Sequence, residues 1–499
     1  MPKSNSILDN ARLSEYSPSL LKSNSYYLQN RRRMNVADAK ALSSRKVKLI
    51  FVNIVISCVA TSMLSTALTT ALPSISTELD ISVTTAQWLT SGYSLAMGIM
   101  LPLTAFLITR VPTRKLYLTG IAVFIIGLIA SILSPGFIIL MFGRILQACA
   151  TGILSAMGQV LILSIFPPEN RGTAMGAYGL SVTAAPVIAP TIAGILIDSF
   201  GWRMIFIVVL AVMVISFIYG IIVLENVLET KDIKMDFPSF VLSILAFGGL
   251  TLAVGNLGSA GFLSPVILVP LIIGAVTMVI FVYKQLHMEN PLLELRTLKQ
   301  KNFTLAVIAS MLLYLVLMGS TTVIPLYVQN IQGYSATISG LVVLPGSLVS
   351  AALSLVAGKI YDKIGIRRLF IVGAACLLLS NLLMLTVTMD TSIWAVSFYN
   401  VIRNISCACL LMPLVTWGAG SFKGSNTAHA TALLNSFRTI AGAVGTAVFV
   451  AVMTMVTTNS ESTLGDNAAI HGFNMTFAGM AVAAAALLAI PILFIRKRK

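Results

Sequence analysis

Three arginines lie inside long apolar stretches of the sequence, where a charged side chain can act on an ion or on a substrate. They are Arg144, Arg403 and Arg438. A charge at the centre of a bilayer costs about 3 kcal/mol or more unless it is paired or reached by water, so such residues by default face a functional cavity. The alternative is a structural role, in which backbone carbonyls pair with the guanidinium. Both interpretations are open for each of the three.

Carboxylates are scarce at a comparable depth. Asp198, near the far end of the apolar stretch 173–197, is a candidate partner for Arg144, and Asp236 stands at the start of a later stretch. The excess of buried arginines over buried acids predicts a central cavity of net positive charge, which favours neutral or anionic amphiphiles over dications. The candidates for transport or coupling are therefore Arg144, Asp198, Arg403 and Arg438.

Enzyme chemistry finds little support. The sequence holds no G-x-x-x-x-G-K-[ST] phosphate loop, no cluster of zinc ligands and no nucleophile beside a base, so we expect neither an enzyme nor a bound cofactor or metal. His429 starts the stretch 428–456, where we expect a helix-start or interfacial position, with titration near neutral pH as the alternative. Without a nucleotide site, an ion or solute gradient must supply the energy.

The composition indicates a chain that faces lipid. Of its 499 residues, 57% are hydrophobic and only 10% are charged, and the mean hydropathy is +0.92. A soluble globule carries about 25% charged residues because its surface faces water. The excess of 33 Lys and Arg over 17 Asp and Glu would suit nucleic acid, but these cations fall in loops on one side of a predicted membrane, which explains them without such a partner.

Apolar stretches of about 20 residues recur after residue 46, each long enough to cross a hydrocarbon core of about 30 Å as a helix. Helix is required because lipid offers no partners for backbone amides. We predict an all-α integral membrane fold with about fourteen transmembrane helices, at 48–72, 84–104, 115–133, 136–162, 173–197, 203–223, 237–257, 264–285, 303–329, 335–357, 369–387, 392–417, 428–456 and 474–495.

The topology follows from where lysine and arginine fall. Fourteen crossings put both termini on one side of the membrane. Most of the lysines and arginines fall on that same side. They are Arg31, Arg32, Arg33, Lys46, Arg110, Arg114, Lys115, Arg171, Lys231, Lys234, Lys284, Arg296, Lys299, Lys301, Lys359, Lys363, Arg367, Arg368, Lys423 and residues 496–499. The other side holds Arg203 and several acids. This asymmetry predicts a protein of the inner membrane with both ends in the cytoplasm. Residues 1–46 are predicted to form a disordered cytoplasmic tail without a signal peptide, and Met34 is an alternative start.

Two predicted cytoplasmic loops, 105–115 and 358–368, have similar sequences and lie eight predicted helices apart. The spacing predicts two six-helix bundles, at 47–225 and 303–499, separated by two inserted helices and a cytoplasmic loop at 226–302. Duplicated bundles that rock about a central site are a common plan of secondary transporters.

The second loop resembles the G-x-x-x-D-x-x-G-x-R-R signature of the major facilitator superfamily, with Gly358, Asp362, Gly365, Arg367 and Arg368 at its fixed positions. Three further stretches, at 144–147, 185–194 and 429–446, resemble the fourteen-helix drug:proton antiporter branch, which includes lincomycin and multidrug exporters. The resemblance covers the chain from about residue 47 onward.

The resemblance implies that the second loop is a latch that holds the outward-closed arrangement, with Asp362 capping a helix terminus and Arg367 and Arg368 as charged partners across the bundle. The alternative is a topology signal with a tight turn. The first loop departs from the pattern at Ala105 and Thr109, so a latch there must be weaker or built differently.

The resemblance also implies that the fifth predicted helix is a hinge and a seal between the halves, through Pro186, Pro190 and Gly194. Ordinary packing of small residues is the alternative. Arg144 is implied in proton coupling. The acidic residue that the family places in its first helix is Leu64 here, which puts proton coupling through that helix in doubt.

The function that follows is a secondary-active exporter of small amphiphilic molecules, a multidrug efflux protein that works by proton-coupled antiport and alternating access. Its expected partners are the lipid bilayer, a small-molecule substrate and protons. Export of one physiological solute or anionic amphiphile is the first alternative. A non-transporting membrane sensor on the same fold is the second.

Overall fold

The structure is a computed structural model that describes residues 44–232, 235–255, 264–289, 291–422 and 424–495. The predicted tail up to residue 43, with Met34, lies outside the described residues, as do Lys234, Lys423 and residues 496–499. Residues from Ile50 onward form one compact unit, and the architecture and the sites concern this unit alone.

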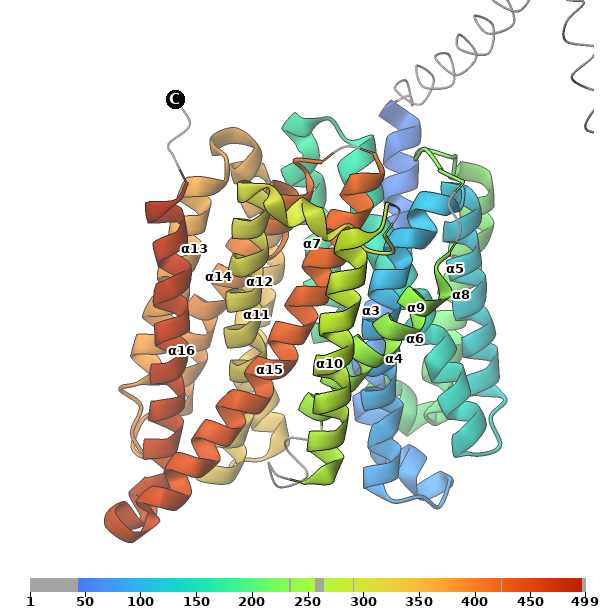
Figure 1. Ribbon diagram of the computed structural model, residues 1–499. Helices are drawn as coiled ribbons and strands as arrows, with labels where there is room; N and C mark the ends of the chain where they lie inside the picture. Colours follow the sequence, from blue (N-terminus) through green and yellow to red (C-terminus); the bar gives the residue numbers. More distant parts are fainter. Residues whose placement is uncertain (1–43, 233–234, 256–263, 290, 423, 496–499) are drawn as a thin grey trace, which may run out of the picture. The chain divides into compact units, whose positions relative to one another are not determined.

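Fourteen α-helices make up almost all of the described residues, which include no strand. They are α3 (Ser44–Glu78), α4 (Val83–Arg110), α5 (Thr113–Ile132), α6 (Phe137–Ile165), α7 (Arg171–Phe200), α8 (Arg203–Val223), α9 (Phe237–Gly255), α10 (Pro265–His287), α11 (Lys301–Leu326), α12 (Ala336–Ile364), α13 (Ile366–Met384), α14 (Ile393–Ala419), α15 (Ser425–Leu464) and α16 (Ala468–Leu493) (Figure 1). The prediction of an all-α membrane fold with about fourteen helices is confirmed. Thirteen of the helices are long and apolar enough to cross a membrane, and α9 is shorter.

Helix ends differ from the ends of the apolar stretches. The clearest case is α15, which has 40 residues where the apolar stretch predicts 428–456. Hydropathy marks the part of a helix that lipid surrounds, but polar residues can continue the same hydrogen-bonded backbone into the water layer. This helix stops at Gly465, whose φ of 51° favours glycine.

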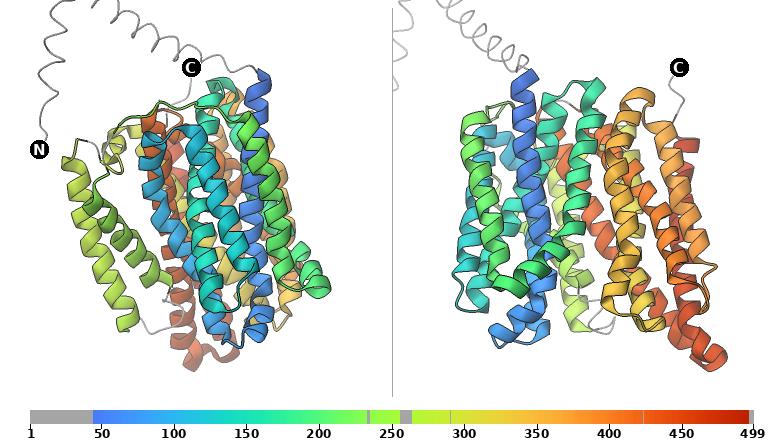
Figure 2. Two further views of the ribbon diagram at one scale, coloured as in Figure 1. Left: turned by 90° about the vertical axis from the view of Figure 1, so that its right-hand side faces the viewer. Right: turned by 180° about the vertical axis from the view of Figure 1, so that it is seen from behind.

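The helices form an N-terminal bundle, α3–α8, and a C-terminal bundle, α11–α16. Two pairs of helices make the most extensive contacts between the bundles, α7 with α12 and α4 with α15. The inserted helices α9 and α10 pack side by side, and α9 also contacts α4 and α15 (Figure 2). Gly249 allows this close pairing, since an added Cβ would lie 2.8 Å from the carbonyl oxygen of Pro270.

The connections alternate between two ends of the helices. The connections after α4, α6, α8, α10, α12 and α14 lie at one end, called here the basic end because Arg110, Arg171, Lys284 and Arg367 lie at it. Those after α3, α5, α7, α11, α13 and α15 lie at the opposite end, which carries Glu78, Asp80, Asp390 and Glu461. The basic end is the upper one in Figure 1.

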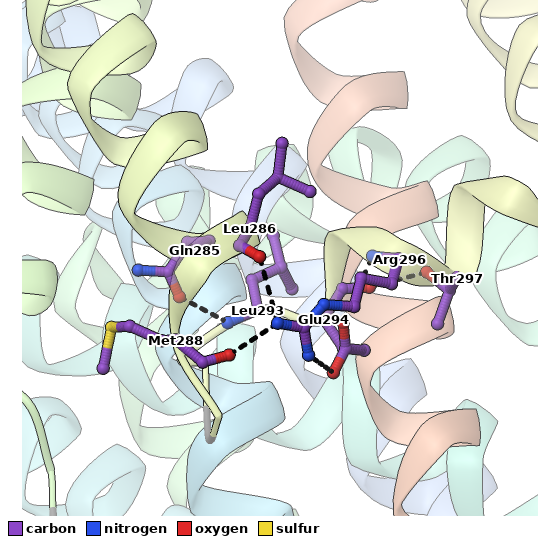
Figure 3. Close-up of polar contacts among 7 residues, drawn as sticks. All are labelled: Gln285, Leu286, Met288, Leu293, Glu294, Arg296 and Thr297. Carbon is purple, nitrogen blue, oxygen red and sulfur yellow. Dashed lines mark hydrogen bonds and ion pairs between the residues drawn. The ribbon is translucent and has the colours of Figure 1, made fainter.

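At the basic end, the segment between α10 and α11 is tied back to α10. The Arg296 guanidinium donates to the carbonyl oxygens of Leu286 (3.0 Å) and Met288 (2.8 Å) and lies 3.8 Å from a carboxylate oxygen of Glu294 (Figure 3). The Gln285 side chain accepts from the backbone N–H of Leu293 at 3.2 Å. These contacts fix the last turn before the C-terminal bundle begins.

A second ion pair, between Lys284 and Asp236 (2.5 Å), joins the two inserted helices at the same end. Partial burial favours the neutral carboxyl of Asp236. Hydrogen bonds from Lys284 and Ser239 outweigh this effect, so the pKa of Asp236 lies below its usual value. The Asp236 carboxyl is therefore ionised at neutral pH.

Candidate functional site

A cavity of about 460 Å³ lies between the two bundles. Helices α3, α4, α6 and α7 line one side, and α14 and α15 line the other. Most of the polar lining residues are uncharged, and they include Thr61, Ser65, Tyr93, Thr151, Ser155 and Tyr178. Among the described lining residues the one charged side chain is Arg438. The cavity is therefore amphiphilic, with a single positive charge and no carboxylate in its described wall.

Arg438 and Asn435, one turn apart on α15, both face this cavity. The Arg438 guanidinium stacks on the Tyr314 ring, 4.5 Å from its centroid, and its Nε and Nη1 have no hydrogen-bond partner among the described residues. The Asn435 amide nitrogen donates to Gln159 of α6 at 3.0 Å, whereas its Oδ1 has no partner there. Buried donors and acceptors are normally satisfied, so these atoms are unsatisfied polar groups in the wall of the cavity.

Arg144 is fully buried behind the cavity wall. Its Nη1 donates to Gln147 (2.7 Å) and its Nε to the carbonyl oxygen of Leu89 (3.2 Å). Its guanidinium stacks on Tyr93, 4.2 Å from the ring centroid, and the Tyr93 hydroxyl donates to Thr151 at 2.9 Å. Arg144 therefore touches the cavity only through Tyr93.

The structure does not pair Arg144 with Asp198. Asp198 is exposed near the opposite end of α7, and the partners of Arg144 come from α4 and α6. The depth counted along a helix gives the height of a side chain but not the direction in which it points. At that end the ion pair joins Arg203 with Glu78, which also accepts from the Trp202 indole N–H at 2.7 Å.

Arg403 lies inside the C-terminal bundle, away from the cavity. It is buried and donates to the Asn400 side chain (2.6 Å), the Ser320 hydroxyl and the carbonyl oxygen of Leu317 (3.4 Å). These contacts match the structural alternative, in which carbonyl and amide oxygens pair with the guanidinium. The structure thus places one of the three arginines, Arg438, in the cavity itself.

Asp362 joins the two bundles at the basic end. Its Oδ1 accepts from the backbone N–H of Gly172 (2.7 Å), and its Oδ2 accepts from the backbone N–H (2.7 Å) and hydroxyl (2.6 Å) of Thr173. Asp362 therefore caps the N-terminus of α7, where the partial positive charge of the helix favours a carboxylate. Sequence reasoning expected a capping role but did not identify the helix.

Glycines let α7 and α12 meet beside this cap. A Cβ on Gly358 would lie 2.2 Å from the carbonyl oxygen of Gly172, which no side chain tolerates. One turn further, the Ser354 hydroxyl donates to the carbonyl oxygen of Gly176 at 3.1 Å. Arg171 reaches from α7 to the carbonyl oxygen of Gly420 after α14, at 3.1 Å. The cavity is closed toward the basic end.

Toward the opposite end of the same two helices, two glycines face no neighbouring group. An added Cβ on Gly194 of α7, or on Gly340 of α12, would have no atom within 4 Å, and Pro190 is exposed. Pro186 lines the cavity within a continuous α7. The contacts between α7 and α12 given above lie in the basic half of both helices, and the hinge and seal expected at Pro186, Pro190 and Gly194 stay a prediction.

The remaining signature residues shape the start of α13. Gly365 has a φ of 74° and separates α12 from α13, which explains a glycine there. The Arg367 Nε donates to the carbonyl oxygen of Pro491 at 3.4 Å, and Arg368 is exposed. No ion pair joins either arginine to a described acid, so the charged contact expected across the bundle is absent.

The first loop builds its contact between the bundles differently from the second. Thr109 stands where the second loop has Asp362, and its hydroxyl lies 3.4 Å from Nε2 of His429 on α15. His429 lies near the start of α15, as one of the two expected positions requires. Its side chain is only 7% exposed and is buried against α4. One hydrogen bond replaces the three that Asp362 accepts.

This difference predicts a small effect of Thr109→Val on transport. A single neutral hydrogen bond contributes about 1 kcal/mol, so we expect the initial flux in proteoliposomes to fall by roughly fivefold or less. Thr463→Val, at an exposed threonine near the end of α15, is the matched control. A loss as large as that caused by an Asp362 substitution would contradict the unequal strength of the two contacts.

Sequence reasoning missed Gln159, which links the bundles through Asn435. Its signal is visible in retrospect, because an amide side chain inside the apolar stretch 136–162 requires a polar partner. That this partner lies on α15, 276 residues later, has no local signature.

Comparisons with known proteins agree with this architecture. The family model described as Major Facilitator Superfamily matches residues 53–446. The uncharacterized MFS-type transporter YcnB of Bacillus subtilis is 36% identical over 420 residues, which cover 84% of this chain and 89% of that protein. The lincomycin resistance protein LmrB of Bacillus subtilis is 34% identical over 417 residues, 83% of this chain and 87% of LmrB. Among solved structures, the proton:xylose symporter XylE matches with a TM-score of 0.61 at 14% identity, over 92% of this chain and 98% of XylE.

Proposed function

This chain belongs to the major facilitator superfamily, and we propose that it exports small amphiphilic molecules by alternating access. The observation that carries the proposal is the cavity between the bundles, together with the close contact of α7 and α12 at the basic end. A site that is open to one end at a time is what alternating access requires. The similarity to LmrB supports a substrate of antibiotic type.

The positive-inside rule supports an orientation in the cell membrane with the basic end in the cytoplasm. In that orientation the even number of helices puts both termini inside. The contacts of Asp362 and Gly358 then hold an arrangement that is closed inward. Under this proposal the latch belongs to the outward-open state, whereas the resemblance implies an outward-closed arrangement, which stays a prediction.

Protons are the coupling ion that we propose, exchanged for substrate in antiport. At the position of the family's acid, α3 carries Leu64, which is buried, and the one acid of this helix, Glu78, pairs with Arg203 at the end opposite the basic end. The polar network that remains next to the cavity is Arg144, Gln147 and Tyr93. The network supports a coupling role for Arg144 because Tyr93 lines the cavity and its ring contacts the Arg144 guanidinium. A charge that enters the cavity therefore acts on Arg144 across this ring.

An anionic amphiphile is a second candidate substrate. The observation that favours it is the single cavity charge on Arg438, whose Nε and Nη1 lack partners among the described residues. An anion there would gain charge-assisted hydrogen bonds. A dication would meet a positive charge and no described carboxylate in the wall.

Flux through purified protein in liposomes tests the proposal. With an imposed pH gradient, we expect transport of an amphiphilic dye that stops when a protonophore collapses the gradient. Transport that continues without the gradient would contradict proton coupling but support a uniporter. If none of three dyes (anionic, neutral and cationic) is transported, the result would favour the membrane sensor. Protein-free liposomes with the same gradient are the control.

A further inference from the structure

A second hollow, of about 1230 Å³, lies at the basic end of the C-terminal bundle and has no part in the transport site. The ends of α11, α12, α13, α14 and α16 surround it. Four cations line this hollow, called here the basic hollow: Lys301, Lys363, Arg367 and Arg368. Its single described acid is Asp362, whose two carboxylate oxygens already accept three hydrogen bonds from α7.

Two of these cations contact other groups of the fold. Arg367 is anchored through its Nε to the carbonyl oxygen of Pro491 at 3.4 Å, which leaves both terminal nitrogens of the guanidinium for another acceptor. The Lys301 ammonium lies 5.9 Å from the centroid of the Phe494 ring. Ordering these side chains beforehand lowers the entropy that a bound anion has to overcome.

Two other cations at the basic end are already neutralised. Lys284 pairs with Asp236, and Arg296 pairs with Glu294 while donating to two carbonyl oxygens (Figure 3). No described carboxylate lies within ion-pair distance of the four cations in the basic hollow. The N-terminus of α13 also opens there at Gly365 without a side-chain cap, which adds a partial positive charge.

We propose that the basic hollow binds a phosphate-bearing anion, and that the source is the headgroup of an anionic phospholipid. Arginine binds phosphate through two parallel hydrogen bonds, and lysine adds a compact charge. The hollow lies where the membrane helices end, which is the depth of the headgroups. Exposed Phe494 and Ile364 and the ring of Trp417 line the same hollow, so acyl chains find an apolar surface beside the charges. Basic pockets between membrane helices on the cytoplasmic side are suited to such lipids.

The test uses the purified full-length protein and measures lipid retention by native mass spectrometry. The variant is Lys301→Gln with Lys363→Gln, which removes two charges from the basic hollow without touching the latch. Each lysine near an anionic headgroup contributes about a factor of five. Screening lowers the product, so we expect phosphatidylglycerol to bind roughly tenfold more weakly. Phosphatidylcholine binding should not change.

The matched control is Lys299→Gln with Lys359→Gln. It removes the same charge two and four residues away in sequence, from exposed lysines that do not line the hollow, and should change binding by roughly twofold or less. Equal losses in the two double variants would overturn the proposal in favour of diffuse surface charge, and so would no loss in either. Inorganic phosphate is the second probe. Displacement of phosphatidylglycerol by phosphate supports a phosphate site, and retention of phosphate without any preference for phosphatidylglycerol over phosphatidylcholine overturns the lipid source.

Discussion

Replacing Asp362 with alanine is expected to reduce transport by roughly 100-fold. The carboxylate accepts three hydrogen bonds from Gly172 and Thr173 of the other bundle, and hydrogen bonds to a charged group contribute about 1.5–3 kcal/mol each. Water recovers part of this when the bundles separate, so we expect a net loss of about 3 kcal/mol for the arrangement closed at the basic end. That corresponds to roughly a 100-fold change in population. The measurement is the initial rate of dye flux in proteoliposomes.

The control for this prediction is Asp232→Ala, an exposed acid at the same end of the helices, which should leave flux unchanged. Asp362→Asn should fall between the two, because the amide keeps one acceptor but loses the charge that favours the helix terminus. Expression and thermal unfolding should match the unsubstituted protein, since Asp362 is outside the core of its own bundle. Unchanged flux for Asp362→Ala would reject the latch role and leave the topology signal as its explanation.

The helices could be predicted from the sequence because lipid imposes a single solution on the backbone. A run such as 203–223 has to be helical, and the structure places α8 at those residues. The capping role of Asp362 was likewise predictable, since a carboxylate near a helix end that is followed by a glycine is well placed to accept hydrogen bonds from backbone N–H groups. In both cases the information lies within a few residues along the chain.

The partners could not be predicted because they are set by the rotation of helices about their own axes and by packing between distant segments. Asp198 was a candidate partner because few carboxylates lie near the depth of Arg144, yet Arg144 donates to Leu89 and Gln147 and Asp198 is exposed. Asp362 caps a helix that begins about 190 residues earlier in the chain. Neither outcome changes the hydropathy pattern from which the helices were predicted.

The sequence also could not predict which end of the bundles is in close contact in the structure. Under the proposed alternating access the same helices close either end in turn, so one sequence has to fit both arrangements. Gly172 and Gly358 are used in the arrangement described here, whereas Gly194 and Gly340 have open space around them. We interpret the second pair as positions reserved for the alternate arrangement, in which the other ends of α7 and α12 approach.

Replacing Arg438 with glutamine should separate anionic from neutral substrates. Arg438 is the one charge in the described cavity wall, and two of its nitrogens lack partners. A charge-assisted hydrogen bond to a carboxylate is worth about 2 kcal/mol, which is roughly a 30-fold change. We therefore expect export of a carboxylated amphiphile to fall by about 30-fold, while export of its methyl ester changes by about twofold or less.

Arg438→Lys should restore part of the loss, because lysine keeps the charge but not the paired geometry. Equal losses for the acid and the ester would instead mean that Arg438 acts on the architecture of the cavity, through its stacking on Tyr314. A strong preference of the unsubstituted protein for a dicationic dye would reject the proposal of an anionic substrate.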